Sequence, residues 1–286
     1  MKNQKFGIEI EMIGLTRERA AKVAAEHFGT TAKYEGGGYE TWSAKDATGR
    51  TWKFVRDASI TGGGEQVELV SPICEYADIE TIQELVRKLR AAGAKTNDSC
   101  GIHVHINAAP HTPQSLRNIS NIMASKEDLL FKALEVKAER ERYCRKADTD
   151  FIKNLNKKKP KTLEQLHKLW YEGHNDSHMN YSDTRYTALN LHAVFKKGTV
   201  EFRLFNGTTH AGKIKAYIQL CLAISHQAIT QRSATAAKTL TTNEKFTFRT
   251  WLLRLGMIGD EFATARHHLL ANLEGDSAFR HGRVAA

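Results

Sequence analysis

The stretch SCGIHVHINA, residues 99–108, has the alternation of a half-buried β-strand. Apolar residues occupy every second position, and His103 and His105 lie between them. Side chains two residues apart on a strand leave the same face of the sheet, with Cα atoms about 6.6 Å apart. The stretch therefore predicts a strand that directs two imidazoles toward one place.

Two further stretches with the same period carry pairs of ionisable residues, and a third stretch carries a single one. These residues are Glu9 and Glu11 in FGIEIEM, Glu201 and Arg203 in TVEFRLF, and Glu68 in EQVELVSP. Any one such strand is typical of a solvent-facing surface. Three strands that each present a charged pair favour a shared functional face.

Carboxylates crowded on one face repel one another unless a proton or a cation lies between them. An oxygen-rich site with one imidazole suits Mg²⁺ or Mn²⁺ better than a structural zinc. Arg203, two residues from Glu201, adds a guanidinium that can hold a phosphate through two hydrogen bonds. Divalent metal ions together with an arginine are the groups with which enzymes bind the phosphates of ATP.

The remaining sequence predicts strands and helices interleaved, with connections between strands that look like hairpins. We expect an α+β fold with an antiparallel sheet that has one polar face. The expected helices are 15–28, 78–92, 112 to about 143, 162–171, 211–232, 244–256 and 260–273. The expected strands are 6–12, several short ones within 31–71, 101–107, and a hairpin formed by TALNLHAVF and GTVEFRLFN around a KKG turn. We expect a basic break at 154–161 and a loop at 172–183.

The bulk properties are those of a globular protein: 286 residues, of which 41% are hydrophobic and 26% charged. The net charge of +10 favours an anionic partner. Four dispersed cysteines without a CxxC pair indicate reduced thiols, and neither a signal peptide nor a long apolar span is evident. We expect a cytoplasmic protein without a membrane segment.

The order of the motifs resembles the putative amidoligase family. The chain has FGIEIEM, then a DAS-to-VELVSP segment, CGIHVHI, LNLHAV and TVEFRLFNGT, which extends the resemblance over about residues 6–230. That family belongs to the carboxylate-amine ligases with the glutamine synthetase and glutamate-cysteine ligase fold. The resemblance implies a curved antiparallel sheet with an acidic concave face and helices on the other face. It divides the chain into a catalytic domain, 1–235, with a helical insertion at about 112–183, and a C-terminal helical extension, 236–286.

The resemblance also implies roles for individual residues. The implied metal ligands are Glu9, Glu11, Glu68, His103 and Glu201, with Glu65 as the rival of Glu68. Arg203, and with it Arg185 in DTRYTALN, would bind the phosphates of ATP. The implied cofactors are ATP and Mg²⁺ or Mn²⁺.

Other polar residues have two interpretations each. His105 orients substrate or is a hydrogen-bonded structural histidine. Asp57 and Ser59 bind substrate or nucleotide, or form an Asx-type turn. Asn190 and Asn206 flank the predicted final hairpin and are weaker candidates for substrate binding.

The implied reaction is ATP-dependent amide-bond formation through an acyl phosphate, with a carboxylate and an amine as substrates. The acid could belong to an acidic peptide or a cell-wall component, and the oligomeric state stays open. A phosphotransferase of the same fold and a metal-dependent hydrolase are the alternatives that keep the site. A basic nucleic-acid-binding protein is a further alternative, which the acidic face disfavours.

Overall fold

A computed structural model describes residues 1–62, 64–174 and 176–280. Its centre is an open eight-stranded sheet with the order β2-β3-β4-β5-β1-β6-β8-β7, in which every pair of neighbours is antiparallel. The strands are β1 (Phe6–Ile13), β2 (Ala32–Gly36), β3 (Thr41–Lys45), β4 (Thr51–Val55), β5 (Gln66–Val70), β6 (Gly101–Asn107), β7 (Leu189–Asn190) and β8 (Thr199–Asn206). The α+β class with an antiparallel sheet is confirmed.

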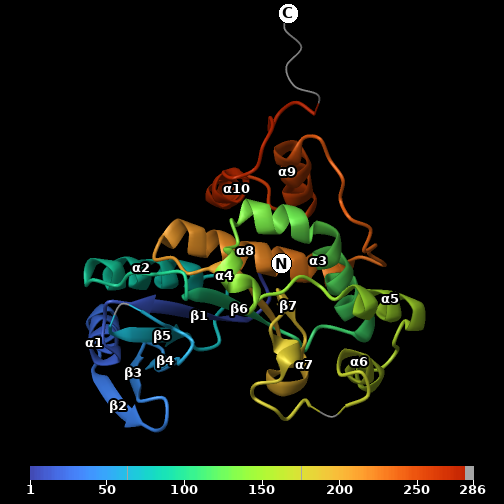
Figure 1. Cartoon of the computed structure of the whole chain (residues 1–286). Coiled ribbons are helices and arrows are strands. Elements are labelled where there is room, and N and C mark those ends of the chain that lie inside the picture. The colour runs from blue at the N-terminus through green and yellow to red at the C-terminus, as the bar shows by residue number, and fades with distance from the viewer. Residues whose placement is uncertain (63, 175, 281–286) are drawn as a thin grey trace, which may run out of the picture.

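The apolar face of the sheet is covered by helices, and the polar face is the other one. Alternate residues Ile8, Ile10 and Met12 of β1 are almost fully buried, as the sequence pattern predicts for the core side. Helices α2, α8 and α3 form a layer over this face, and α9 and α10 lie beyond α8 (Figure 1). The site must therefore lie on the opposite side, where α7 crosses below the sheet (Figure 1).

Ten α-helices lie in the part of the chain that the structure describes. They are α1 (Arg17–Phe28), α2 (Asp78–Ala91), α3 (Pro113–Ala133), α4 (Ala138–Glu141), α5 (Thr149–Lys158), α6 (Leu163–Trp170), α7 (His192–Lys197), α8 (Ala211–Thr230), α9 (Glu244–Arg254) and α10 (Ala263–Leu270). Two 3₁₀ turns occupy Asp183–Arg185 and Asp260–Phe262. Thr112 caps α3 through a reciprocal hydrogen-bond pair with Ser115, and Pro113 occupies the first turn.

The predicted helix from 112 to about 143 is confirmed as far as Ala133, and its continuation beyond that residue is wrong. α3 ends at Ala133, because Glu135 has a left-handed backbone with φ 49°, and the short α4 follows. This break turns the chain back toward the polar face of the sheet. It thereby brings Arg140 of α4 into the site.

The predicted basic break at 154–161 is also wrong for most of its length. α5 continues through Lys158 because Ile152 and Leu155 are buried on one side of it, while its lysines remain exposed on the other. Lys159, with φ 45°, ends the helix just before Pro160. Tertiary burial of two apolar residues outweighs the local charge repulsion.

The first strand of the predicted final hairpin is wrong as well. Only Leu189–Asn190 pairs with β8, and the following residues form α7, which ends at Gly198 with φ 70°. Lys196 and Lys197 fall in its last turn, where the helix dipole favours cations. The chain thus returns to β8 through a helix that covers the polar face.

In the part of the chain that the structure describes, none of the helices combines the length and apolarity needed to cross a membrane.

Candidate active site

The strand register gathers the polar residues of β5, β1, β6, β8 and β7. Glu11 lies opposite Glu68, and Glu9 lies opposite His103. On the other side of β6, His105 lies opposite Glu201. All of these side chains point away from the helix layer, so the face predicted from the strand motifs exists.

The face forms the floor of an open cavity of about 780 Å³. Its walls come from α7, from the chain around Tyr181 and Tyr186, from Arg140 of α4, and from the β2–β3 turn at Tyr39. These segments lie far apart in the sequence. The sheet therefore supplies the charged floor, and the connections between strands supply the walls.

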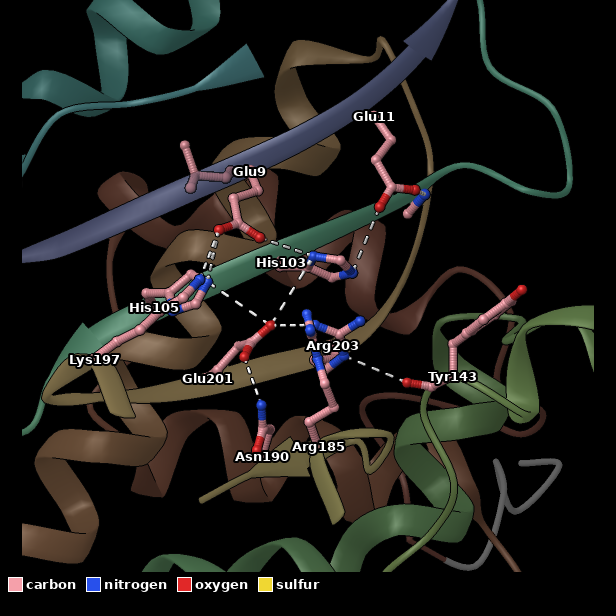
Figure 2. Close-up of polar contacts among 12 residues, drawn as sticks. Glu9, Glu11, His103, His105, Tyr143, Arg185, Asn190, Lys197, Glu201 and Arg203 are labelled. Atoms are coloured by element: carbon pink, nitrogen blue, oxygen red, sulfur yellow. Dashed lines mark hydrogen bonds and ion pairs between the residues drawn. The ribbon is translucent and has the colours of Figure 1, made fainter. Parts of the chain in front are cut away.

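The centre of the floor is a network of carboxylates and imidazoles (Figure 2). His103 Nδ1 lies 3.1 Å from Glu9 Oε2, and its Nε2 lies 3.9 Å from Glu11 Oε1. His105 Nε2 lies 3.3 Å from Glu9 Oε1 and 3.8 Å from Glu201 Oε1. The strand motifs of β1, β6 and β8 thus meet within the reach of single side chains.

Arg203 lies beside Glu201 where the strand register changes. The pairing of β6 with β8 shifts between Ile102 and Val104, next to Arg203, whose N–H donates to Ala188 O at 2.9 Å. The guanidinium donates to Glu201 Oε1 and, at 3.4 Å, to the main-chain oxygen of Tyr143. Arg203 is only 4% exposed, so it is a fixed cation at the edge of the acidic floor.

Two carboxyl groups of the floor are poorly stabilised as anions. Burial raises the pKa of Glu68 well above its usual range, and the charges of Glu9, Glu11 and Asp57 raise it further. Burial also raises the pKa of Glu11 to about 7, against the opposing effect of Arg140. Both shifts are the expected result of crowding carboxylates in one desolvated place.

Two other carboxylates stay ionised because cationic or imidazole neighbours surround them. Burial alone would raise the pKa of Glu201, but Arg203 and the two histidines lower it to about 2. Burial would also raise the pKa of Glu9, which His105 and His103 nevertheless hold well below its usual range. Burial and the charge of Arg203 lower the pKa of His103 to about 4, so its imidazole is neutral, the form that ligates metals.

The donor set fits divalent cations. Three groups of side chains offer ligand atoms within 4.8 Å of one another: Glu9 with Glu68 and His103, Glu9 with His105 and Glu201, and Glu11 with Asp57 and Glu68. Two buried polar atoms of the floor, His105 Nε2 and Asn190 Oδ1, have no hydrogen-bond partner. A cation between the carboxylates would relieve their repulsion and give the imidazole nitrogen a partner.

The structure distinguishes between Glu68 and Glu65, the two alternative candidates for one metal ligand. Glu68 is buried on the floor, whereas Glu65 is exposed before β5. The structure also places Asp57 near Glu11 and Glu68 as a possible metal ligand. The Asp57 side chain accepts the Ser59 N–H at 2.7 Å, which is the Asx-type turn, and both residues line the cavity.

The two asparagine candidates lie in different environments. Asn190 donates to Glu201 Oε2 at 2.6 Å and lines the cavity. Asn206, at the other end of β8, donates to the main-chain oxygens of Leu134 and Glu135 and accepts from the Lys137 N–H. Asn206 therefore fixes the turn between α3 and α4 instead of facing the cavity.

Arg185 lies at the wall of the cavity, on the 3₁₀ turn before β7 (Figure 2). Its guanidinium carbon lies 5.6 Å from the ring centre of Tyr186, and that of Arg203 lies 6.0 Å from the same ring. Arg185 also donates to Asn180 O at 2.6 Å. The tyrosine ring thus holds the two predicted phosphate-binding arginines on one side of the cavity.

Sequence reasoning missed two cations of the site. Lys197 of α7 lies with Nζ 3.3 Å from Glu9 Oε1, and Arg140 of α4 is buried at the cavity wall. Lys197 belongs to α7, which was predicted as a strand and a turn, and Arg140 belongs to α4, which was predicted as the continuation of one long helix. The one signal in the sequence was their membership of basic clusters, which does not distinguish them from exposed neighbours.

The fold and site define an α+β protein with an open antiparallel sheet, whose polar face carries a cluster of carboxylates and imidazoles next to a buried arginine. Residues 2–225 match the family described as putative amidoligase enzyme, and the chain belongs to that family. The description denotes ligases that form amide bonds. No curated protein matches the chain.

Proposed function

We propose that this protein is an ATP-dependent carboxylate-amine ligase with two divalent metals and a catalytic sheet of the glutamine synthetase type. The observation that carries the proposal is the single face on which Glu9, Glu68, Glu201 and His103 surround one space beside Arg203. Family membership supports the ligase class. The donor set supports Mg²⁺ or Mn²⁺ as the metals.

The residues that would hold the metals are Glu9, Glu11, Glu68, His103 and Glu201, with His105 and Asp57 as additions from the geometry. Bound there, Mg²⁺ would neutralise charge on the phosphate oxygens of ATP. Asn190 keeps the Glu201 carboxylate in position through the hydrogen bond to Oε2. Thr199 does the same for His105, whose Nδ1 lies 3.0 Å from Thr199 Oγ1.

In the first step, a carboxylate oxygen of the acid substrate attacks the γ-phosphorus of ATP. The bond from that phosphorus to the β,γ-bridging oxygen breaks, and ADP leaves with the electron pair. Arg203, with Arg185 near it, stabilises the negative charge on the transferring group. The product is an acyl phosphate, which has the leaving group that a free carboxylate lacks.

In the second step, the nitrogen of a neutral amine attacks the acyl carbon and loses a proton to the solvent. The bond from the acyl carbon to the phosphate oxygen breaks, and inorganic phosphate leaves. His105, whose Nε2 faces Glu9 and Glu201, contributes to this chemistry through the position of these two carboxylates. The net result is an amide, ADP and phosphate.

The walls of the cavity favour an acidic substrate. Lys53, Arg56 and Lys196 line the cavity and are exposed at its mouth. A peptide or cell-wall component with carboxylates beyond the reacting one would find cations there. The same cations would attract ATP.

The test of the metal site compares Glu201→Gln and Glu9→Gln with Glu65→Gln, an exposed glutamate near the same sheet. We expect the first two to weaken binding of Mg²⁺-ATP by at least about tenfold, measured by calorimetry, because a neutral amide is a poor ligand for a hard cation. The control variant should bind as the native protein does. Equal binding by all four proteins would refute the metal assignment.

The fate of phosphate then identifies the reaction class. A ligase releases free phosphate and ADP when acid and amine are both present, whereas a phosphotransferase leaves phosphate on its product. A hydrolase needs no ATP. Mass spectrometry of products from pooled acids and amines, with and without ATP, separates these three outcomes.

A further inference from the structure

Arg140 is a buried cation at the wall of the cavity to which nothing so far gives a role. It is 2% exposed and comes from the one-turn α4, between α3 and α5. It lines the same cavity as Glu11 and Arg203. A buried arginine at such a place needs a reason, because desolvating a guanidinium is costly.

The neighbouring strand has a space that fits this side chain. A Cβ added at Gly101, the first residue of β6, would overlap the terminal nitrogens and the central carbon of the Arg140 guanidinium. The guanidinium therefore lies directly against the backbone of β6. The Gly101 N–H beside it donates to Glu11 Oε2 at 2.6 Å, which places Arg140 next to the acidic floor.

The protein satisfies few of the donors of Arg140. A guanidinium has five N–H groups. The hydrogen bond from Nη2 goes to the main-chain oxygen of Arg203 at 3.4 Å, and the buried Nε has no partner. Among the described residues, no carboxylate lies within ion-pair distance of Arg140, whereas Arg203 is paired with Glu201.

We propose that Arg140 binds the phosphoryl group that is transferred from ATP, facing it together with Arg203. This inference rests on the proposed ligase function and adds a residue from α4 to its machinery. Two guanidinium groups joined through the Arg203 main chain suit an anion with more than one charge, because each can donate to a different oxygen. The terminal phosphate of ATP is such an anion, and a substrate carboxylate is not.

The alternative is that Arg140 only anchors α4 to the sheet. A structural anchor would affect the stability of the protein and would treat all ligands alike. If Arg140 contacts the transferred phosphoryl group, its loss lowers the affinity for ATP and leaves the affinity for ADP unchanged, because ADP lacks that group. The difference between the two nucleotides therefore separates the two roles.

The experiment measures the affinity of ATP and of ADP, each with Mg²⁺, by calorimetry. The variants are Arg140→Gln, Arg140→Lys and Gly101→Ala, with Arg87→Ala on the exposed side of α2 as the control. We expect Arg140→Gln to weaken the affinity for ATP at least about tenfold and the affinity for ADP less than about threefold. The reason is that a hydrogen bond to a charged group of ATP is lost. Gly101→Ala should cause the same loss of affinity for ATP, because its Cβ displaces the Arg140 guanidinium. Arg140→Lys should cause a smaller loss of affinity for ATP.

The outcomes distinguish this inference from the function on which it rests. Two outcomes refute the role of Arg140 when the native protein binds ATP: Arg140→Gln binds ATP equally well, or its affinities for ATP and ADP fall to the same extent. In both cases the ligase proposal stands. If the native protein does not bind ATP, both fail. The melting temperature of each unliganded variant shows whether a loss of affinity reflects unfolding.

Discussion

At the scale of single residues, the site is a balance between carboxylates that repel and cations that compensate. Glu9 and Glu201 are stabilised as anions by histidines and Arg203, while Glu68 and Glu11 have raised pKa values. Without a further cation beside them, Glu68 and Glu11 are poorly stabilised as anions. This imbalance is the physical reason for expecting a metal there.

His105 gives a residue-scale prediction, because its orientation depends on one hydroxyl group. Thr199 Oγ1 lies 3.0 Å from Nδ1, which leaves Nε2 directed at Glu9 and Glu201. Replacing Thr199 by valine keeps the shape and removes this hydrogen bond. We expect Mn²⁺ affinity to fall by roughly tenfold, as for other groups that orient metal ligands.

Electron paramagnetic resonance of bound Mn²⁺ would measure the change. Thr51→Val, a half-buried threonine of β4 elsewhere in the same sheet, is the matched control and should bind Mn²⁺ normally. An unchanged affinity in Thr199→Val would mean that His105 is not a ligand in the Glu9 and Glu201 group.

At the scale of elements, the main strand motifs and the short helix α6 were predictable, whereas α7 and the separate helix α4 were not. FGIEIEM, HVH and TVEFRLF predicted the strands correctly because alternation is a local property of the sequence. The segment that forms α7 contains Ala193, Val194 and Phe195, whose side chains pack in either a strand or a helix. Its helical conformation depends on tertiary contacts that no local pattern encodes.

The same limit applies to the candidate site. Register between β1, β5, β6 and β8 decides which residues meet, and the shared polar period was enough to predict most of the floor. Arg140 and Lys197 reach the floor from α4 and α7, whose paths depend on where α3 and β7 end. Arg140 and Lys197 were therefore beyond prediction from strand spacing.

The end of α7 gives a prediction at this scale. Gly198 adopts φ 70°, and a Cβ added there would meet no atom within 4 Å, so strain of the backbone is the only cost of a side chain. We expect Gly198→Ala to lower the free energy of unfolding by about 1 kcal/mol, measured by urea denaturation. Gly38→Ala is the matched control, because its surroundings are equally open and its φ is not positive.

Gly38→Ala should change the free energy of unfolding by less than about 0.5 kcal/mol. If both alanine variants behave alike, the left-handed end of α7 does not contribute to stability, and another feature must end the helix.

At the scale of the whole molecule, the layers form one structure. The buried Phe248, Leu252 and Leu269 of α9 and α10 belong to the same hydrophobic cluster as the apolar face of the sheet. Glu261, in the turn before α10, accepts hydrogen bonds from Tyr76 at 2.9 Å and from Gln219 at 3.0 Å. The segment after the family match thus covers α8 and joins it to the beginning of α2.

From this arrangement we expect residues 236–286, which the sequence predicts as a C-terminal helical extension, to be needed for the stability of the whole chain. A chain that ends at residue 235 would expose the side of α8 that α10 covers and would leave the fully buried Gln219 without Glu261. Exposing several large apolar side chains costs about 1.5–3 kcal/mol each, which is a large share of the stability of a typical domain. We expect the chain that ends at residue 235 to have a lower melting temperature than the full chain and to bind a hydrophobic dye. If the chain ending at 235 melts at the same temperature as the full chain, the α9 and α10 layer is an independent addition, and the family-matched segment alone contains the complete core.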